Sequence, residues 1–434
     1  MSRRIYAVAT GQNHANLPPI LSVAEQGDLV VWLETPLARQ RRWVAGANEV
    51  LRRRHIQQTS IELEDADVHS PRALARRILD DLSQHPNAEA VFVLNGGQKH
   101  MVLGVGEARQ GARLQLVYSD VRPAQLWVLA PEDSAFHAEA LRNPLTFDEF
   151  LLATGLSEAP GTTSCLVWSH NGGAQVEPAV SYAQAGPIKL PVLRSWMQTN
   201  PELRARWQDL VDKAIRNTGV RLGVAQRLEL VQRLGSVDST LFTATEAFFR
   251  HAMQQVLQQQ ASLGKQFEQS VARAVVRFLT ENPDLARPVV EVRQGLVVAK
   301  RETPELTFAE YDVAILLENA MLIHLECKSG ALDEKDLFAR LAKLREVGGQ
   351  AAQQVLCVPL RTEPADQLAH THETLQRLQR LCQVSPNFQL LVYTEPGQAP
   401  AYEVEGQRYE FPTFEQGLRQ LLAPFRPEVA RGPR

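Results

Sequence analysis

Residues 1–130 alternate short apolar runs with longer stretches in which apolar residues recur at helical spacing. The apolar runs predict five strands, at Ile5–Ala9, Leu29–Leu33, Ala90–Leu94, Leu114–Tyr118 and Gln125–Leu129. Helical patterns lie between them at Leu37–Arg54 and Pro71–Leu82. Strands that are apolar on both faces and alternate with helices are typical of a parallel sheet covered by helices on both sides. The sequence therefore predicts an α/β fold that begins with a doubly wound sheet.

A chain of 434 residues is too long for one hydrophobic core, so we expect two or three domains. Its 44% apolar and 22% charged residues are typical of a globular protein. From residue 157 the chain becomes rich in Gly, Pro and Ser, and a polar helical stretch follows before a second α/β pattern begins. We therefore expect an α/β domain at 1–156, a linker and helical segment at 157–262, and a second α/β domain at 263–434.

The overall charge and the cysteines exclude several classes of protein. A net charge of -3 argues against a generally basic nucleic-acid-binding surface, although it allows a local basic groove. Cys165, Cys327, Cys357 and Cys382 have neither the paired spacing of a metal site nor that of a disulfide framework. The first apolar run is too short for a signal peptide, and no run approaches the roughly 20 residues that span a bilayer. We expect a cytoplasmic protein with reduced thiols and no membrane contact.

A predicted β-hairpin in the last domain carries a candidate site. Residues 311–317 and 321–328 are predicted as strands, and the loop of three residues between them has a length common in hairpins. Pairing the last residue of the first strand with the first residue of the second places Asp312 directly opposite Glu326.

Alternation along the two strands separates an apolar face from a polar one. The apolar face, which we predict to be core, consists of Val313, Ile315, Leu317, Met321, Ile323, Leu325 and Cys327. The opposite face brings Asp312, Glu326 and Lys328 together at one end of the hairpin. Two carboxylates that face each other at about 5 Å repel, and a bound divalent cation removes that repulsion. Such a cation can stabilise charge on a phosphoryl group and activate water, which Lys328 can help to orient.

The surroundings of the hairpin favour a site over a solvated surface. A Glu-x-Lys sequence alone is common and usually lies on a solvated face, but an Asp opposite a Glu on an otherwise apolar hairpin is much rarer. Upstream, Glu268 lies on a predicted helix beside the apolar stripe that begins with Phe267, so it can reach the site. His324 and Glu310 lie on the polar face, and we interpret them as supporting residues rather than catalytic ones.

The order of helix, hairpin and Glu-x-Lys resembles the PD-(D/E)xK restriction-endonuclease-like superfamily, with Tyr311 in place of the motif's proline. The resemblance implies catalytic roles for Glu268, Asp312, Glu326 and Lys328. It implies Mg²⁺ or Mn²⁺ held by Asp312, Glu326 and the backbone carbonyl of Cys327. The following helix around 341–345, the Gly348-Gly349 turn and the strand 355–358 fit the same fold.

Two loops of the N-terminal domain are candidates for ligand binding. In a doubly wound sheet, ligands bind beyond the carboxyl ends of the strands where the strand order reverses, between the first and fourth strands. The loop after the first strand is 11–16, and the loop after the strand Ala90–Leu94, which we assign the fourth place in this arrangement, is 95–101. Both are rich in amides and small residues, and neither is a Gly-x-Gly-x-x-Gly or Walker loop. An enzyme that uses NAD or ATP is therefore disfavoured.

Together the two loops resemble those of the CARF sensor domain, the CRISPR-associated Rossmann fold that binds cyclic oligoadenylates across a dimer interface. The match rests on Gly11-Gln12 with Asn16-Leu17 and on Asn95-Gly96-Gly97-Gln98-Lys99. The resemblance implies a set of ligand-binding residues: Gly11, Gln12, Asn13, Asn16, Thr35, Asn95, Gly96, Gly97, Gln98, Lys99 and His100.

A CARF sensor ahead of a PD-(D/E)xK domain resembles the ancillary nucleases of type III CRISPR systems, over residues 1–155 and 263–434. The resemblance implies a homodimer that is activated by cyclic tetra-adenylate. It implies cleavage of single-stranded DNA or RNA, or nicking of DNA, with Mg²⁺ or Mn²⁺. The resemblance thus implies an α/β endonuclease in antiviral defence, built from a Rossmann-like sensor, a helical middle segment and a restriction-endonuclease-like domain.

Other interpretations stay open at this point. The arginines at 39, 41, 42 and 52–54 spread around a helix surface, which favours a solvated face over ligand or substrate steering. A second domain that has lost catalysis would make the chain a nucleotide-responsive regulator, against which the complete set of Asp312, Glu326 and Lys328 argues. A repair or restriction endonuclease without a gate is disfavoured by the non-basic loops of the first domain.

Overall fold

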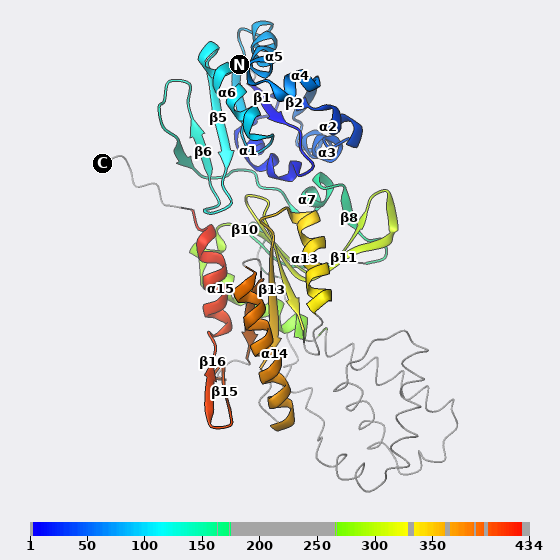
Figure 1. Ribbon diagram of the computed structural model, residues 1–434, viewed down its shortest axis with the longest axis vertical. Helices are drawn as coiled ribbons and strands as arrows, with labels where there is room; N and C mark the ends of the chain where they lie inside the picture. Colours follow the sequence, from blue (N-terminus) through cyan, green and yellow to red (C-terminus); the bar gives the residue numbers. More distant parts are fainter. Residues whose placement is uncertain are drawn as a thin grey trace.

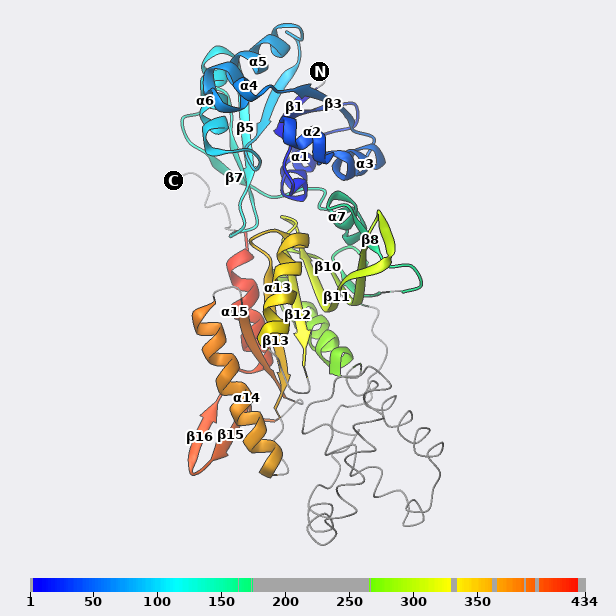
Figure 2. The same ribbon diagram turned by 45° about the vertical axis from the view of Figure 1, so that its right-hand side comes forward.

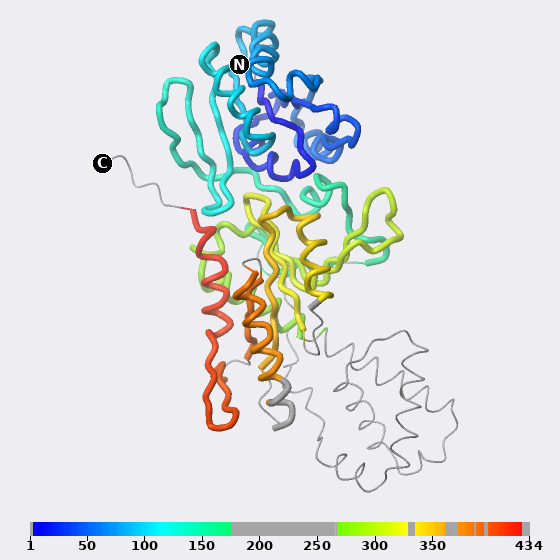
Figure 3. The backbone as a smooth tube through the Cα atoms, in the orientation of Figure 1, coloured from blue at the N-terminus to red at the C-terminus, as the bar shows by residue number. Residues whose placement is uncertain are grey.

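The computed structural model describes residues 3–162, 164–172, 174, 265, 267–328, 334–360, 365–385, 388–394 and 398–427. Two large sheets follow each other along the long axis of the molecule, and a small hairpin lies at the end opposite the N-terminal domain (Figure 1). The backbone tube in Figure 3 shows the chain completing the first sheet before it enters the second.

The first sheet has seven strands in the order β3-β2-β1-β4-β5-β6-β7. Their bounds are β1 (Arg3–Val8), β2 (Leu29–Glu34), β3 (Gln57–Glu62), β4 (Glu89–Val93), β5 (Leu114–Ser119), β6 (Leu126–Leu129) and β7 (His137–Glu139). The first five in this order pair in parallel, and β6 and β7 are antiparallel. β1 and β4 are neighbours, so the strand order reverses between them as expected. The predicted doubly wound sheet is confirmed.

Helices cover both faces of this sheet because its central strands are apolar on both sides. The helices are α1 (Leu17–Val23), α2 (Pro36–Arg41), α3 (Ala45–Arg53), α4 (Asp65–His69), α5 (Pro71–Ser83), α6 (Lys99–Gly111) and α7 (Phe147–Ala153), with the 3-10 turn η1 (Asn13–Ala15). The apolar residues of α4, α5 and α6 pack on one face. Those of α1, α2, α3 and α7 pack on the other. The single helix expected at Leu37–Arg54 is divided into α2 and α3 at Arg42, whose φ is 50°.

The second sheet is mixed and has the order β14-β13-β12-β11-β10-β8, with β9 also paired to β10. Its strands are β8 (Leu156–Glu158), β9 (Cys165–Ser169), β10 (Val289–Lys300), β11 (Thr303–Leu317), β12 (Leu322–Cys327), β13 (Gln353–Pro359) and β14 (Phe388–Tyr393). β10, β11 and β12 are antiparallel neighbours, whereas β12, β13 and β14 are parallel. A small two-stranded sheet pairs β15 (Ala401–Val404) with β16 (Gln407–Glu410).

Both faces of the second sheet are buried. The helices are α12 (Pro283–Ala286), α13 (Glu334–Gly348), α14 (Ala365–Val384), α15 (Phe414–Leu422) and the turn η4 (Ala423–Phe425), besides the helical residues 267–281. Residues 267–281 and α15 pack on the face that carries Val313 and Ile323. α13 and α14 pack on the face that carries Ala314 and Leu322. Figure 2 shows α13 lying against the strands on this side.

The segment expected as linker and helices begins with strands of the second sheet. β8 and β9 pair antiparallel with β10, which lies far along the chain from both of them. The polar helical stretch expected at about 192–263 lies outside the described residues. Among the described residues, no helix is both long enough and apolar enough to cross a lipid bilayer.

Candidate active site and ligand-binding loops

The β11–β12 hairpin has the register that its loop length predicts. Val313 pairs with Leu325 and Leu316 with Leu322, so each pair of partners is arranged as expected. Asp312 and Glu326 face each other one residue beyond the Val313–Leu325 pair. The seven residues of the predicted apolar face all belong to one buried cluster. The sequence pattern therefore brings both carboxylates to one end of one face.

Asp312 is held in place by the backbone of the opposite strand. Its Oδ2 accepts a hydrogen bond from the backbone N–H of Cys327 at 2.6 Å. Only 7% of Asp312 is exposed. Burial, together with the charges of Glu326 and Glu268, raises the pKa of Asp312 above its usual range. A divalent cation would relieve this cost because it favours the ionised carboxylate.

Glu326 is fully buried and has two cations beside it. Lys328 Nζ lies 2.6 Å from Oε1, and Arg340 Nη1 lies 2.7 Å from the same oxygen and 2.8 Å from Oε2. Burial acts to raise the pKa of Glu326, but the charges of its neighbours outweigh burial and hold that pKa below its usual value. Glu326 is therefore an ionised carboxylate in the interior. Arg340, which lies on α13, is a member of the site that the sequence analysis missed.

His324 supports Asp312 rather than carrying charge itself. Its Nε2 accepts a hydrogen bond from the backbone N–H of Asp312 at 3.3 Å and lies 3.5 Å from Glu326 Oε2. Burial lowers the pKa of His324 to about 4, so the ring is neutral at pH 7. The ring packs edge-on against Tyr311, with centroids 5.0 Å apart. These contacts agree with the supporting role expected for His324.

Glu268 lies within electrostatic range of the other acids. It is half-buried on the helix 267–281, beside the buried ring of Phe267. Burial raises its pKa, and so does the charge of Glu310, whereas Lys265 and Lys328 act to lower it. In turn the charge of Glu268 raises the pKa of Asp312. The four residues expected to form the site therefore influence one another electrostatically.

The side chains present fit a hard divalent cation. Asp312, His324 and Glu326 each offer a ligand atom within 4.8 Å of the others. The two carboxylates supply the oxygens that Mg²⁺ prefers, and Mn²⁺ also accepts an imidazole nitrogen. The Nε2 atom of His324 already accepts a hydrogen bond, so the carboxylates are the favoured ligands.

In the first domain, the loop after β1 is ordered by its own amides. Asn13 Oδ1 accepts from the Thr10 N–H at 2.9 Å, and Asn13 Nδ2 donates to the Trp43 carbonyl at 2.8 Å. Asn16 Nδ2 donates to the Val8 carbonyl at 2.9 Å. Both asparagines are buried, whereas Gly11 is exposed and Gln12 half-buried. Within this loop the asparagines hold the backbone, whereas Gly11 and Gln12 are accessible.

The loop after β4 lies directly against the end of β1. A Cβ atom on Gly96 would lie 2.4 Å from the Val8 carbonyl oxygen, so only glycine fits there, and Gly97 has a φ of +92°. Asn95 exchanges hydrogen bonds with Ser119 at the end of β5. The two glycines let the loops meet at the reversal of strand order.

The remaining expected ligand residues surround these loops. Gln98 and Lys99, at the start of α6, are exposed, and His100 is half-buried. Thr35 caps α2 by accepting a hydrogen bond from the Ala38 N–H at 3.2 Å. The N–H groups that begin α6 and the cation of Lys99 suit an anionic ligand.

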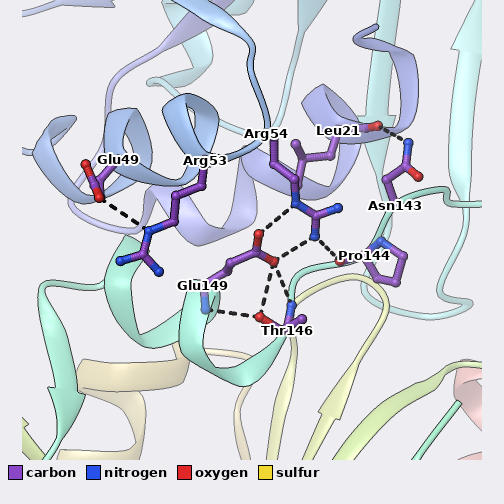
Figure 4. Close-up of polar contacts among 8 residues, drawn as sticks. All are labelled: Leu21, Glu49, Arg53, Arg54, Asn143, Pro144, Thr146 and Glu149. Atoms are coloured by element: carbon purple, nitrogen blue, oxygen red, sulfur yellow. Dashed lines mark hydrogen bonds and ion pairs between the residues drawn. The ribbon is translucent and has the colours of Figure 1, made fainter. Parts of the chain in front are cut away.

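The arginine cluster divides into exposed and structural members. Arg52 and Arg53 pair with Glu49 on the surface of α3, as expected for a solvated face. Arg54 instead reaches Glu149 in the first turn of α7, with both contacts at 2.7 Å, and donates to the Pro144 carbonyl (Figure 4). Arg54 therefore ties the first domain to the helix that leads into the second sheet.

Fold and site together define a two-domain α/β protein. A Rossmann-like sheet, with two loops that meet where its strand order reverses, precedes a restriction-endonuclease-like sheet with buried acids beside a lysine. Protein VC1899 from Vibrio cholerae has this fold, with a TM-score of 0.54 and 16% identity over 90% of this chain and 94% of its own. Can2 from Sulfobacillus thermosulfidooxidans, solved in complex with cyclic tetra-adenylate, matches with a TM-score of 0.51 and 16% identity over 89% of this chain and 94% of its own. These likenesses confirm the predicted fold class.

No protein-family model and no curated protein matches this sequence.

Proposed function

We propose that this chain is a divalent-metal-dependent endonuclease of type III CRISPR defence that is activated by a cyclic oligoadenylate. The observation that carries the proposal is the buried pair of Asp312 and Glu326, with Lys328 Nζ 2.6 Å from Glu326. Two buried carboxylates on neighbouring strands are costly without a compensating cation. A phosphodiester substrate is the natural partner of a site that combines such a cation with a lysine.

Each residue of the site has a different role in the proposed cleavage of the phosphodiester. Asp312, Glu326 and the backbone carbonyl of Cys327 would hold Mg²⁺ or Mn²⁺. A bound cation supplies a Lewis acid for the phosphoryl oxygen and lowers the pKa of a water molecule. Lys328, whose side chain is 29% exposed, orients the attacking water and offsets charge on the phosphoryl oxygens. Glu268 is the carboxylate that would act as a general base, because burial raises its pKa and so makes it a better proton acceptor.

The first domain is the proposed sensor. Its two loops meet where the strand order reverses, which is where this class of sheet binds ligands. The likeness in fold to Can2, which was solved with cyclic tetra-adenylate, supports a cyclic oligoadenylate as the ligand. A ring of four identical nucleotides has two-fold symmetry, so a homodimer would present each loop to it twice.

Cleavage of labelled nucleic acid tests the proposal. Single-stranded DNA, single-stranded RNA and supercoiled duplex are each incubated with Mn²⁺ or Mg²⁺, with and without cyclic tetra-adenylate. The same reactions are run with Glu326→Ala. We expect cutting that requires the nucleotide and is lost in the variant, and the three substrates identify the preferred nucleic acid.

Other outcomes point to other functions. Cutting that ignores the nucleotide would retain the endonuclease and overturn the gate. Nucleotide binding without cutting of any substrate would make the chain a regulator. In that case Mn²⁺ binding to the native chain and to Glu326→Ala would also be equal.

A further inference from the structure

Helix α13 is a rigid connection between the sensor and the nuclease centre. Leu337, Leu341, Leu344 and Val347 are all buried and form one stripe that packs on the second sheet. A helix rises 1.5 Å per residue, so Arg340 and Gly348 lie about 12 Å apart along it. Because this stripe is packed along its length, a displacement of one end is transmitted to the other rather than absorbed.

At the nuclease end, Arg340 occupies the carboxylate of Glu326. Its Nη1 lies 2.7 and 2.8 Å from the two oxygens, so it sits between them. A divalent cation held by both oxygens would take the same position. Glu326 has no exposed surface, whereas the side chain of Arg340 is 39% exposed. The arginine can therefore leave toward solvent, and the glutamate cannot.

At the sensor end, α13 meets the first ligand loop. His14 lies against the backbone just beyond α13, since a Cβ atom added to Gly349 would lie 3.4 Å from its Nε2. Gly349 has a φ of +78°, and a Cβ atom there would lie 2.9 Å from Gln12 Oε1. His14 also packs edge-on against Phe150, with centroids 5.3 Å apart. The loop that begins with Gly11 and Gln12 thus bears directly on the end of α13.

The hairpin that carries Glu326 is attached to the second ligand loop instead. Asn319, in the β11–β12 turn, donates hydrogen bonds to the carbonyls of Asp120 and Val121 at 3.1 and 3.0 Å. The neighbouring Ser119 is bound to Asn95 of the second ligand loop. The two partners of the Arg340–Glu326 ion pair are therefore anchored to different ligand loops. A ligand that moves one loop relative to the other changes the separation of the pair.

We propose that Arg340 is an autoinhibitory counter-ion of the nuclease centre, withdrawn by α13 when a nucleotide displaces the two sensor loops. This inference rests on the proposed function, because it assigns the regulation of the same site. In the ligand-free state Arg340 holds the position of the cation and adds a positive charge that repels it. When the ligand is bound, Glu326 is released to the cation, and binding of nucleotide and cation become mutually favourable.

Manganese binding to the whole chain, followed by electron paramagnetic resonance, tests the inference without relying on cleavage. Arg340→Met removes the charge and keeps an unbranched, flexible side chain, and Arg340→Lys keeps the charge. Lys343→Met is the matched control, because Lys343 is an exposed cation on the same helix, 5.9 Å from the Phe308 ring. Without nucleotide, we expect Arg340→Met to bind Mn²⁺ about tenfold more tightly, since a unit charge a few ångströms away is removed.

Two further results are expected. Cyclic tetra-adenylate should tighten Mn²⁺ binding by the native chain and by Lys343→Met, and should have little effect on Arg340→Met. Arg340→Met should also cut nucleic acid without nucleotide, whereas Arg340→Lys should remain dependent on it. Unchanged thermal unfolding of Arg340→Met would exclude a folding defect as the cause.

The opposing results separate this inference from the proposed function. If the native chain cuts with nucleotide but Arg340→Met binds Mn²⁺ no more tightly, autoinhibition is wrong and the function stands. Loss of nucleotide-activated cutting in Arg340→Met, with Mn²⁺ affinity unchanged, would make Arg340 a positioning residue of the active state and also overturn autoinhibition. If Glu326→Ala leaves Mn²⁺ affinity unchanged, the proposed metal centre itself fails.

Discussion

Glu326 and Asp312 lie side by side, yet their surroundings move their pKa values in opposite directions. Lys328 and Arg340 lie within 2.7 Å of Glu326 and keep it ionised. Asp312 is buried and faces the charges of Glu326 and Glu268, which together raise its pKa although the Cys327 N–H acts to lower it, so its proton is retained to higher pH. One fixed negative charge and one proton-dependent charge thus occupy the centre. The pH dependence of the free energy of unfolding should reveal this difference between the two carboxylates.

The prediction at this scale concerns Asp312→Asn in the absence of divalent ions. The native pKa of Asp312 is raised above the unfolded value of about 3.9, so the native state binds a proton that the unfolded state has lost. Stability therefore falls as pH rises through this window. Between about pH 5 and about pH 8, the unfolding midpoint of the native chain should fall more steeply than that of the variant. At the upper pH the variant should be more stable by roughly 1–2 kcal/mol.

Differential scanning fluorimetry with EDTA measures these midpoints. Addition of Mn²⁺ should then stabilise the native chain and leave Asp312→Asn unchanged, because only the carboxylate binds the cation strongly. Parallel pH curves for the two proteins would contradict the raised pKa of Asp312.

At the scale of elements, the loop after β4 depends on one close approach. Gly96 lies against the Val8 carbonyl and the Asn16 amide, and a Cβ atom there would lie 2.4 Å from the carbonyl oxygen and 3.0 Å from the amide. A methyl group at this position forces the loop away from the end of β1. The proposed ligand-binding surface of the two loops should change, although the second sheet is not touched.

We therefore expect Gly96→Ala to weaken binding of cyclic tetra-adenylate at least about tenfold, because a misplaced backbone loses charge-assisted hydrogen bonds to the ligand. Gly106→Ala is the control, because Gly106 lies on α6 and an added Cβ meets no atom within 4 Å. That change should leave the affinity unaltered and stabilise the helix by up to about 1 kcal/mol. Calorimetric titration measures both affinities. Equal affinities of Gly96→Ala and the native chain would show that this loop does not form part of the ligand-binding site.

The elements that the sequence predicted best were those with strong local patterns. The register of β11 and β12 followed from loop length and alternation, and with it the opposition of Asp312 and Glu326. The strand β3 was missed because most of its residues are polar and exposed at the edge of the sheet. β8 and β9 are short, and their pairing with β10 is a tertiary event that no local pattern contains.

Arg340 is a residue of the candidate site that local sequence patterns could not identify, for the same reason. Its position follows from the packing of α13, so the distance to Glu326 cannot be obtained from a separation of 14 residues along the chain. The one available signal was the apolar stripe through Leu337 and Leu341, which places the intervening arginine beside the buried face. Lys328 needed no such information because it adjoins the strand that carries Glu326.

At the scale of the whole molecule, one apolar cluster crosses the boundary between the sheets. It includes Ile5 and Trp32 of the first sheet, Phe150 of α7, and Leu316 and Leu356 of the second sheet. Polar contacts reinforce it, since Arg293 of β10 pairs with Asp148 at 3.0 Å and the Phe147 N–H donates to Glu291. A shared core makes the unfolding of one sheet costly for the other.

The two sheets should therefore unfold together. Hydrogen exchange in increasing urea, followed by mass spectrometry, should give coincident midpoints for peptides from β1 and β12. A ligand of the sensor at 100 times its Kd adds about 2.7 kcal/mol to the stability of everything that unfolds with the site. Cyclic tetra-adenylate should consequently shift both midpoints by the same amount. A shift confined to β1 peptides would show that the sheets are energetically independent.

The pairing of β8 and β9 with β10 also has a consequence for biosynthesis. β9 ends at Ser169 and β10 begins at Val289, so the ribosome releases the edge of the second sheet about 120 residues before the strand that it pairs with. At ordinary rates of translation this interval lasts on the order of ten seconds. The first sheet is complete throughout that time, and the acids of β11 and β12 are made only afterwards. Each newly made molecule thus has the strands of its first sheet before the acids of the proposed metal centre are made, so the proposed nuclease domain is never produced ahead of the proposed sensor.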